Sequence, residues 1–152
     1  MKVPGPVNSI TFHIKNMCFQ AKPRPRAQVV QKSGKRPYAH IYTPMSYLKY
    51  EDAVSSEIQS QYDGEIHDGP FSIEMVFYRP MPQSWSKVKQ QRKEFTMHDS
   101  KPDGDNLGKG ILDAMEGIIF KNDSKCFDTR IVKLWSLQEE LCIRVNFFEV
   151  IK

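Results

Sequence analysis

Two aspartates lie two positions apart after a Lys-Pro pair, in the last third of a chain of 152 residues. In an extended segment, Asp103 and Asp105 point the same way, so their carboxylates can share one cation. Carboxylate oxygens suit magnesium or manganese rather than zinc, and Mg²⁺ needs only two or three of them because it keeps several waters. The spacing indicates a site for a hard divalent cation, although Asp-x-Asp before a helix is also typical of a helix cap.

Three later residues have spacings that support such a site. Lys109 follows Asp105 by four positions, so a helix beginning there places both on one face, where a lysine can neutralise a scissile phosphate. Asp113 is four positions further on and can pair with Lys109. Asp123 falls in a turn after the helix, and the returning chain can bring it beside Asp103. This set fits metal-assisted phosphodiester hydrolysis, although each residue alone is more typical of a solvated helix or a turn.

The distribution of charge points to a polyanionic partner. Residues 1–50 contain nine Lys/Arg and no acid, whereas residues 51–152 contain thirteen Lys/Arg and all eighteen acids. The first third of the chain is therefore +9 and the remainder −5, which favours nucleic acid as a partner. The candidate DNA-binding residues are Lys22, Arg24, Arg26, Lys32, Lys35 and Arg36 in the segment 20–37, and Lys87 and Lys89 in a short basic helix.

The composition excludes several classes of protein. No stretch approaches 18 consecutive apolar residues, so we expect no membrane span. The N-terminal MKVPGPVNS has no apolar signal core, and three cysteines without metal-type spacing indicate reduced thiols, so a cytoplasmic protein is expected. His67 and His98 have no spaced partner and are not expected to bind metal.

Apolar periodicity predicts the elements that position the acids. Strands are predicted around residues 10–14 and 70–79, and at 127–135 and 141–150, the last two able to pair as an antiparallel hairpin. Helices are predicted from Thr43-Pro44 to about residue 61, at 87–95, and from Asn106 to Glu116. Residues 20–37, with interleaved prolines, are predicted to be a long basic loop, which is typically functional or disordered.

This element order predicts one α+β domain spanning residues 1–152. We expect a mixed, largely antiparallel sheet with helices packed against it, because strands outnumber helices and do not strictly alternate with them.

The pattern around the acids resembles one known family, the RusA Holliday junction resolvases, which are small phage and prophage endodeoxyribonucleases. The resemblance extends over about residues 10–150, and its specific part is the run Lys101-Pro102-Asp103-Gly104-Asp105-Asn106-Leu107-x-Lys109, then Leu112-Asp113-Ala114-Met115-x-Gly117, then Asn122-Asp123. It implies a homodimer that cuts four-way DNA junctions symmetrically, uses Mg²⁺ (or Mn²⁺ in its place), and takes branched DNA rather than a small molecule as substrate.

By the same resemblance, Asp103, Asp105 and Asp123 correspond to the catalytic, metal-binding acids and Lys109 to the catalytic lysine. Asn106 and Asp113 are expected to support them. Two positions depart from the family pattern. Asn122 replaces the first acid of an Asp-Asp pair, and Gly104 replaces an aliphatic residue, which is expected to loosen the backbone between the two aspartates.

Two other functions stay open at this point. A branched-DNA-binding protein without catalysis would use the same basic segment. A restriction-type nuclease would use Pro102-Asp103 with a downstream Asp-x-Lys on a strand, and Asp123-Ser124-Lys125 has that spacing.

Overall fold

The computed structural model describes residues 4–152 and has one four-stranded mixed sheet at its centre. Its strands are β1 (Asn8–Lys15), β6 (Glu140–Phe147), β4 (Phe71–Pro80) and β5 (Cys126–Ser136), in that spatial order. β6 is antiparallel to both of its neighbours, whereas β4 and β5 run parallel. The predicted α+β class and mixed sheet are confirmed. Residues 1–3 of the N-terminal segment, in which no signal core is expected, lie outside the described residues.

The predicted hairpin of the last two strands is wrong, because β4 lies between β5 and β6. β4 alternates strictly, with Phe71, Ile73, Met75 and Phe77 at most 2% exposed. The strand with the most completely buried face therefore takes a central position. A parallel β4–β5 pair also requires a long crossover between them, and this crossover contains the segment with the acids.

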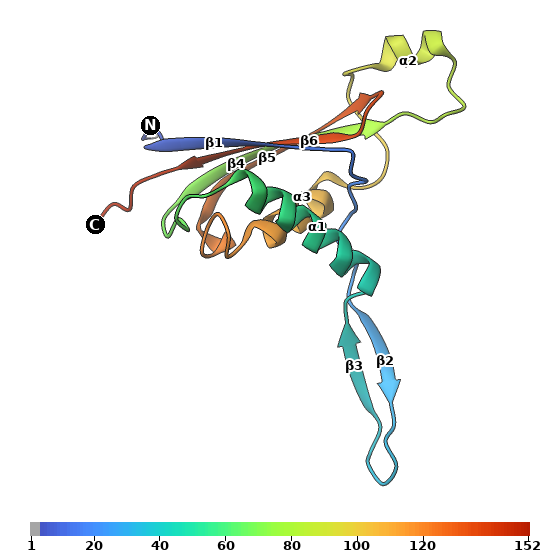
Figure 1. Cartoon of the computed structure of the whole chain (residues 1–152). Helices are drawn as coiled ribbons and strands as arrows, with labels where there is room; N and C mark the ends of the chain where they lie inside the picture. Colours follow the sequence, from blue (N-terminus) through green and yellow to red (C-terminus); the bar gives the residue numbers. More distant parts are fainter. Residues whose placement is uncertain (1–3) are drawn as a thin grey trace.

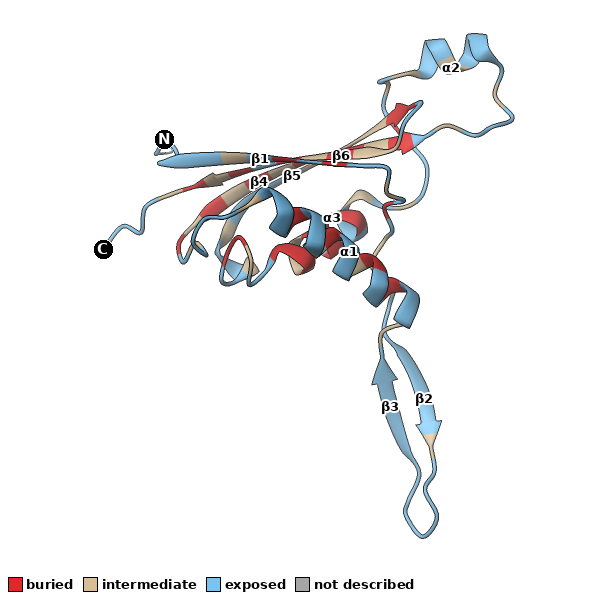
Figure 2. Cartoon of the chain, viewed as in Figure 1, coloured by how far each residue is buried: buried red, intermediate tan, exposed pale blue. Residues whose placement is uncertain are grey.

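Two helices, α1 (Met45–Gln61) and α3 (Gly104–Met115), cover one face of the sheet (Figure 1). The predicted helix after Thr43-Pro44 is present, but Pro44 itself is the N-cap and no side chain caps it. The buried faces of α1 and α3 and the inner face of the sheet form one apolar core (Figure 2).

Glycines set how closely α3 approaches its neighbours. A Cβ added at Gly108 would lie 2.4 Å from Ile131 Cδ1 of β5, and one at Gly110 would lie 2.2 Å from Tyr47 Oη of α1. Gly104 is the first residue of α3, and an added Cβ there would meet Ile131 Cγ2 at 3.3 Å. The residue expected to loosen the backbone is therefore part of the helix and packs against β5.

The prediction that residues 20–37 form a loop is partly wrong. β2 (Arg26–Val30) pairs with β3 (Tyr38–Tyr42) in a two-stranded antiparallel arm. The arm, residues 26–42, extends away from the body of the protein (Figure 1). Prolines that exclude a helix precede each strand, and the paired positions include two valines of β2 and Ile41 and two tyrosines of β3, which favour strands. Gly34, with φ of 75°, turns the chain at the tip.

The short helix α2 (Lys87–Lys93), close to its predicted bounds, forms a second projection. Ser86 caps it by accepting a hydrogen bond from the Lys89 amide at 3.2 Å. The projection is attached to the body through Trp85, whose ring lies 4.9 Å from that of Trp135. Among residues 4–152, no helix combines the length and hydrophobicity that a bilayer crossing requires.

Candidate active site

The first two aspartates lie at the start of α3 with exposed side chains. Asp103 is the N-cap, its carbonyl accepts a hydrogen bond from the Leu107 amide at 3.1 Å, and its carboxylate makes no cap hydrogen bond. Asp105 is in the first turn. Both aspartates therefore lie at the N-terminus of α3, where the first backbone amides of the helix have no partner within it.

Lys109 lies in the middle of an acidic face of α3. Its Nζ donates to Oδ2 of Asp123 at 2.6 Å and lies 3.1 Å from Oδ1 of Asp113. The predicted pairing of Lys109 with Asp113 is confirmed. The hydrogen bond to Asp123, together with contact to Asp113, outweighs desolvation and raises the pKa of Lys109 above its ordinary value.

The chain returns to Lys109 through a tight turn after α3. Gly117, with φ of 82°, donates its amide to the Phe120 carbonyl at 2.8 Å, and the fully buried Phe120 secures the turn in the core. Asn122 then caps a 3-10 turn, Asp123–Lys125, by accepting the Ser124 amide at 2.9 Å. An aspartate could accept the same bond, so the replacement at position 122 retains the local structure.

A cluster of three acids forms around the returning aspartate. Carboxylate oxygens of Asp113, Glu116 and Asp123 all lie within 4.8 Å of one another, a geometry that could hold a metal ion. Glu116 also accepts the Asp123 amide at 3.2 Å. Sequence reasoning missed Glu116, although its position three residues after Asp113 places both on one helix face.

The sequence-predicted ligand set is only partly gathered by the fold. Asp123 lies beside Lys109 and Asp113, and within the described residues neither Asp103 nor Asp105 belongs to a three-acid cluster with it. Asp105 and Asp113 are eight residues apart on one helix, or about 12 Å along its axis. The assignment of Asp103 and Asp105 as metal ligands stays a prediction.

One cation of the basic segment reaches this site. The Lys22 amide donates to the Asn106 carbonyl at 3.1 Å, and the Lys22 ammonium pairs with Asp113. Glu51 of α1 is close to both side chains, and its pKa is raised, chiefly by burial and then by the Asp113 charge, while Lys22 opposes the rise. The acids therefore lie among compensating cations, and the segment that precedes the arm is bonded to α3.

The other predicted DNA-binding residues occupy two exposed projections. Arg24 lies on the approach to the arm, and the remainder of the first group lies on it, namely Arg26, Lys32, Lys35 and Arg36. Lys87 and Lys89 lie on α2, and the Lys89 ammonium also lies 4.3 Å from the ring centroid of Trp85.

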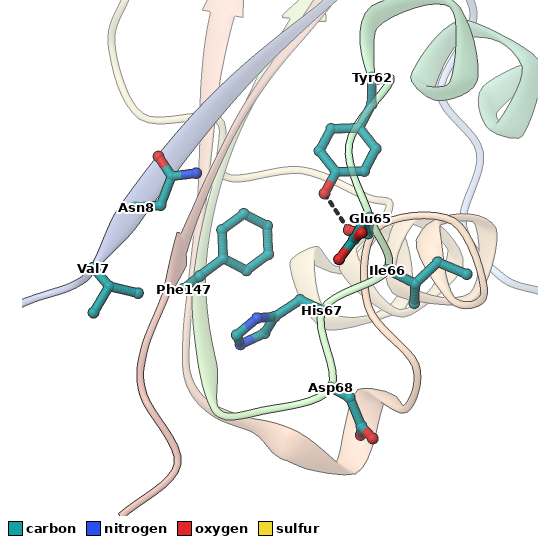
Figure 3. Close-up of a pocket in the computed structure, with 8 residues that line it drawn as sticks. All are labelled: Val7, Asn8, Tyr62, Glu65, Ile66, His67, Asp68 and Phe147. Carbon is teal, nitrogen blue, oxygen red and sulfur yellow. Dashed lines mark hydrogen bonds between the residues drawn. The ribbon is translucent and has the colours of Figure 1, made fainter.

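A cavity of about 390 Å³ lies away from these residues, where the start of β1 meets the end of β6 (Figure 3). The ring of His67 packs 4.7 Å from that of Phe147 at this cavity. None of the predicted catalytic residues lines it.

Comparison with known proteins decides the family. The model of the family described as Endodeoxyribonuclease RusA matches residues 19–146, from the approach to the arm to the last strand. The chain belongs to the RusA family. It is also 35% identical over 135 residues to the uncharacterized protein YqaN of Bacillus subtilis (strain 168), covering 86% of this chain and 89% of that protein. The resemblance seen in the sequence is thereby confirmed, and an endonuclease is the family's general activity.

The restriction-type alternative does not fit the geometry of this RusA-family chain. Asp123-Ser124-Lys125 forms a 3-10 turn rather than a strand. The Lys125 ammonium pairs with Asp68 at 2.5 Å, whereas Asp123 pairs with Lys109. The aspartate and lysine of that triplet therefore engage different partners.

Proposed function

We propose that this protein is a magnesium-dependent, structure-selective endodeoxyribonuclease that resolves Holliday junctions by paired symmetric cuts. The observation that supports this most is the position of Asp123 against Lys109. A turn closed in the core brings an acid from outside α3 to a lysine and two further acids on it. Oxygen ligands can hold the metal ion that hydrolyses a phosphodiester, and a fixed cation can stabilise the charge that develops on the phosphate.

The donors present fit Mg²⁺ or Mn²⁺, since they are carboxylate oxygens without histidine or thiolate. In the proposal, Asp103, Asp105 and Asp123 are the ligands, and Asp113 and Glu116 lie beside Asp123. When bound, the ion supplies an activated water and stabilises charge on the attacked phosphate. Lys109 donates hydrogen bonds to the phosphate or to the leaving oxygen, and its raised pKa keeps it an ammonium throughout.

The two projections are proposed to hold the DNA. The arm carries four of the candidate cations and α2 two, and all six are exposed. They offset the repulsion between an acidic site and a polyanion, and phosphate contacts of this kind dominate affinity.

A homodimer is proposed on symmetry. Two paired cuts in a pseudo-twofold junction require two sites related by a twofold axis, and one chain supplies one acidic site.

A cleavage assay tests the function. With Mg²⁺, the protein should cut a synthetic four-way junction and leave a linear duplex of the same sequence intact; without the metal it should cut neither. Asp103→Asn and Asp105→Asn should each abolish cleavage and retain junction binding, because removing a carboxylate does not weaken attraction to DNA. Asp63→Asn, an exposed acid after α1, is the matched control and should cut normally.

Three results would contradict the proposal. Equal cutting of junction and duplex would remove junction selectivity. Full cleavage activity of the Asp103→Asn and Asp105→Asn variants would contradict their proposed role as metal ligands. Salt-sensitive junction binding without any magnesium-dependent product would leave a DNA-binding protein without catalysis.

A further inference from the structure

Lys133 of β5 makes hydrogen bonds to the segment that leads to Asp103 and Asp105. Residues 95–98 run along the edge of β5, where the Phe95 amide donates to the Trp135 carbonyl at 2.8 Å and the Trp135 amide to Thr96 at 2.9 Å. At the end of this stretch, the His98 amide donates a hydrogen bond to the Lys133 carbonyl at 3.0 Å. Beyond His98 the chain leaves the edge of the sheet and reaches Asp103 within five residues.

The side chain of Lys133 contacts the residues that follow His98, beyond the edge of the sheet. Its Nζ donates to the Ser100 carbonyl at 2.7 Å and to the Pro102 carbonyl at 2.8 Å. A Cβ added at Gly104 would lie 4.0 Å from Lys133 Cδ, so the aliphatic stem passes the first residue of α3. With its backbone bond to His98, Lys133 contacts this segment at three points on both sides of residue 101.

The role of this ammonium differs from that of the other lysines near the site. Lys109 and Lys22 pair with carboxylates, whereas the hydrogen bonds found for Lys133 Nζ end on two main-chain carbonyls. The residue is half-buried and faces the helix side of the sheet, level with Phe77 in the register. Charge-assisted bonds to carbonyls fix a loop more firmly than neutral ones do.

We infer that Lys133 is a positioning residue for the metal site, acting through the backbone of residues 100–103 to set where Asp103 and Asp105 project. This inference rests on the proposed function. Metal ligands need their positions held by groups behind them, and losing such a group lowers metal affinity while the ligands themselves stay in place.

The test compares Lys133→Met and Lys133→Arg with Arg130→Met. Arg130 is a cation of the same strand that pairs with Glu74 at 3.1 Å on the opposite face of the sheet. Two readouts use the full-length protein without DNA, namely Mn²⁺ binding followed by electron paramagnetic resonance and hydrogen exchange of residues 99–107. A third is the Mg²⁺ dependence of junction cleavage.

For Lys133→Met we expect Mn²⁺ binding weaker by about tenfold, the lower end for groups behind metal ligands. Exchange should rise in residues 99–107 and stay unchanged in α1. Cleavage should recover at high Mg²⁺, so the half-saturating concentration moves more than the maximal rate. Lys133→Arg should restore most of each effect, and Arg130→Met should match the parent. If the Met variant does not fold, Lys133→Gln is measured in its place.

Several outcomes overturn the inference. Unchanged exchange in residues 99–107, or unchanged Mn²⁺ affinity, does so directly. Faster exchange across the whole chain shows a general stabilising role, and weaker junction binding at unchanged Mn²⁺ affinity shows a phosphate contact. Absence of cleavage by the parent contradicts the proposed nuclease alone, because the DNA-free exchange measurement still decides the role of Lys133.

Discussion

The ammonium of Lys109 lies 2.6 Å from Oδ2 of Asp123, which comes fourteen residues later in the chain. In the proposed metal site, the lysine and a divalent cation would compete for the same carboxylate. The contact also keeps the lysine beside the place where a phosphate bound to that cation would lie. A single side chain can thus oppose metal binding and promote cleavage, and these effects can be separated.

We predict that Lys109→Met binds Mn²⁺ more tightly and cuts junctions more slowly than the parent. Exposed ion pairs contribute up to ~1 kcal/mol, so removing the competing ammonium should tighten Mn²⁺ binding up to about fivefold. Loss of one charge-stabilising donor should lower the single-turnover rate by about 10²-fold. Lys121→Met, which removes an exposed lysine paired with Asp68, is the control and should change neither value. Weaker Mn²⁺ binding by Lys109→Met would show that the lysine supports the metal site.

The pH dependence of this lysine follows from the direction of its pKa. Because the folded pKa of Lys109 is raised, its ion pairs are fully formed below the ordinary lysine value and are lost only as pH rises through the higher folded value. The ratio of parent to Lys109→Met single-turnover rates should therefore be constant from about pH 6 to about pH 9, well below a lysine pKa of about 10.4. A ratio that climbs across this range would indicate a neutral amine acting as a base.

Local patterns in the sequence predicted local structure well. The alternation of β4 and the spacing of Lys109 and Asp113 on α3 needed only the periods of a strand and a helix. Partners remote in the chain were not accessible in this way. The ion pair of Lys22 with Asp113 spans 91 residues. The position of β4 between β5 and β6 also depends on which strand buries most, a property of the whole fold.

In the candidate site, too, local patterns were predictable from the sequence and contacts between remote residues were not. The short pattern of Asp103, Asp105 and Lys109 was evident from spacing and family resemblance. Glu116 was missed because it becomes part of an acidic cluster only when the turn after α3 returns Asp123 to it. The arm was predicted as a loop because its prolines excluded a helix, while the pairing of β2 with β3 depends on contacts across the tip.

The close approach of α3 to α1 predicts a coupled pair of substitutions. Gly110→Ala places a Cβ 2.2 Å from Tyr47 Oη, and such overpacking costs about 1–3 kcal/mol. Alanine favours a helix by only about 1 kcal/mol over glycine, so we expect a lower free energy of unfolding. Tyr47→Phe removes a buried hydroxyl that has no hydrogen-bond partner among residues 4–152, and leaves the next ring atom 3.5 Å from the new Cβ. The double variant should therefore be more stable than Gly110→Ala alone in urea unfolding.

Additivity of the two substitutions would contradict this packing. Gly5→Ala is the control, since an added Cβ there meets nothing within 4 Å among the described residues, and its effect on the free energy of unfolding should be the same with either residue at position 47.

The tip of the arm should set the salt dependence of junction binding. Lys32, Lys35 and Arg36 are exposed cations in the turn between β2 and β3. Each contact with a phosphate contributes about 0.9 to the slope of log affinity against log salt concentration. Replacing all three by alanine should therefore lower that slope by about 2–3 if all three contact phosphates. The measurement is a filter-binding titration of a four-way junction at several salt concentrations, without divalent metal.

A charge-matched triple variant separates contact from net charge. Lys15, Lys49 and Lys121 are exposed lysines outside the arm (residues 26–42) and α2, and their replacement by alanine removes the same charge. Because screening confines electrostatic attraction to about 10 Å at 0.1 M salt, this variant should keep the slope of the parent. Equal slopes for the two triple variants would show that the arm acts only through net charge. A smaller slope for the arm variant alone would place its tip against the DNA backbone.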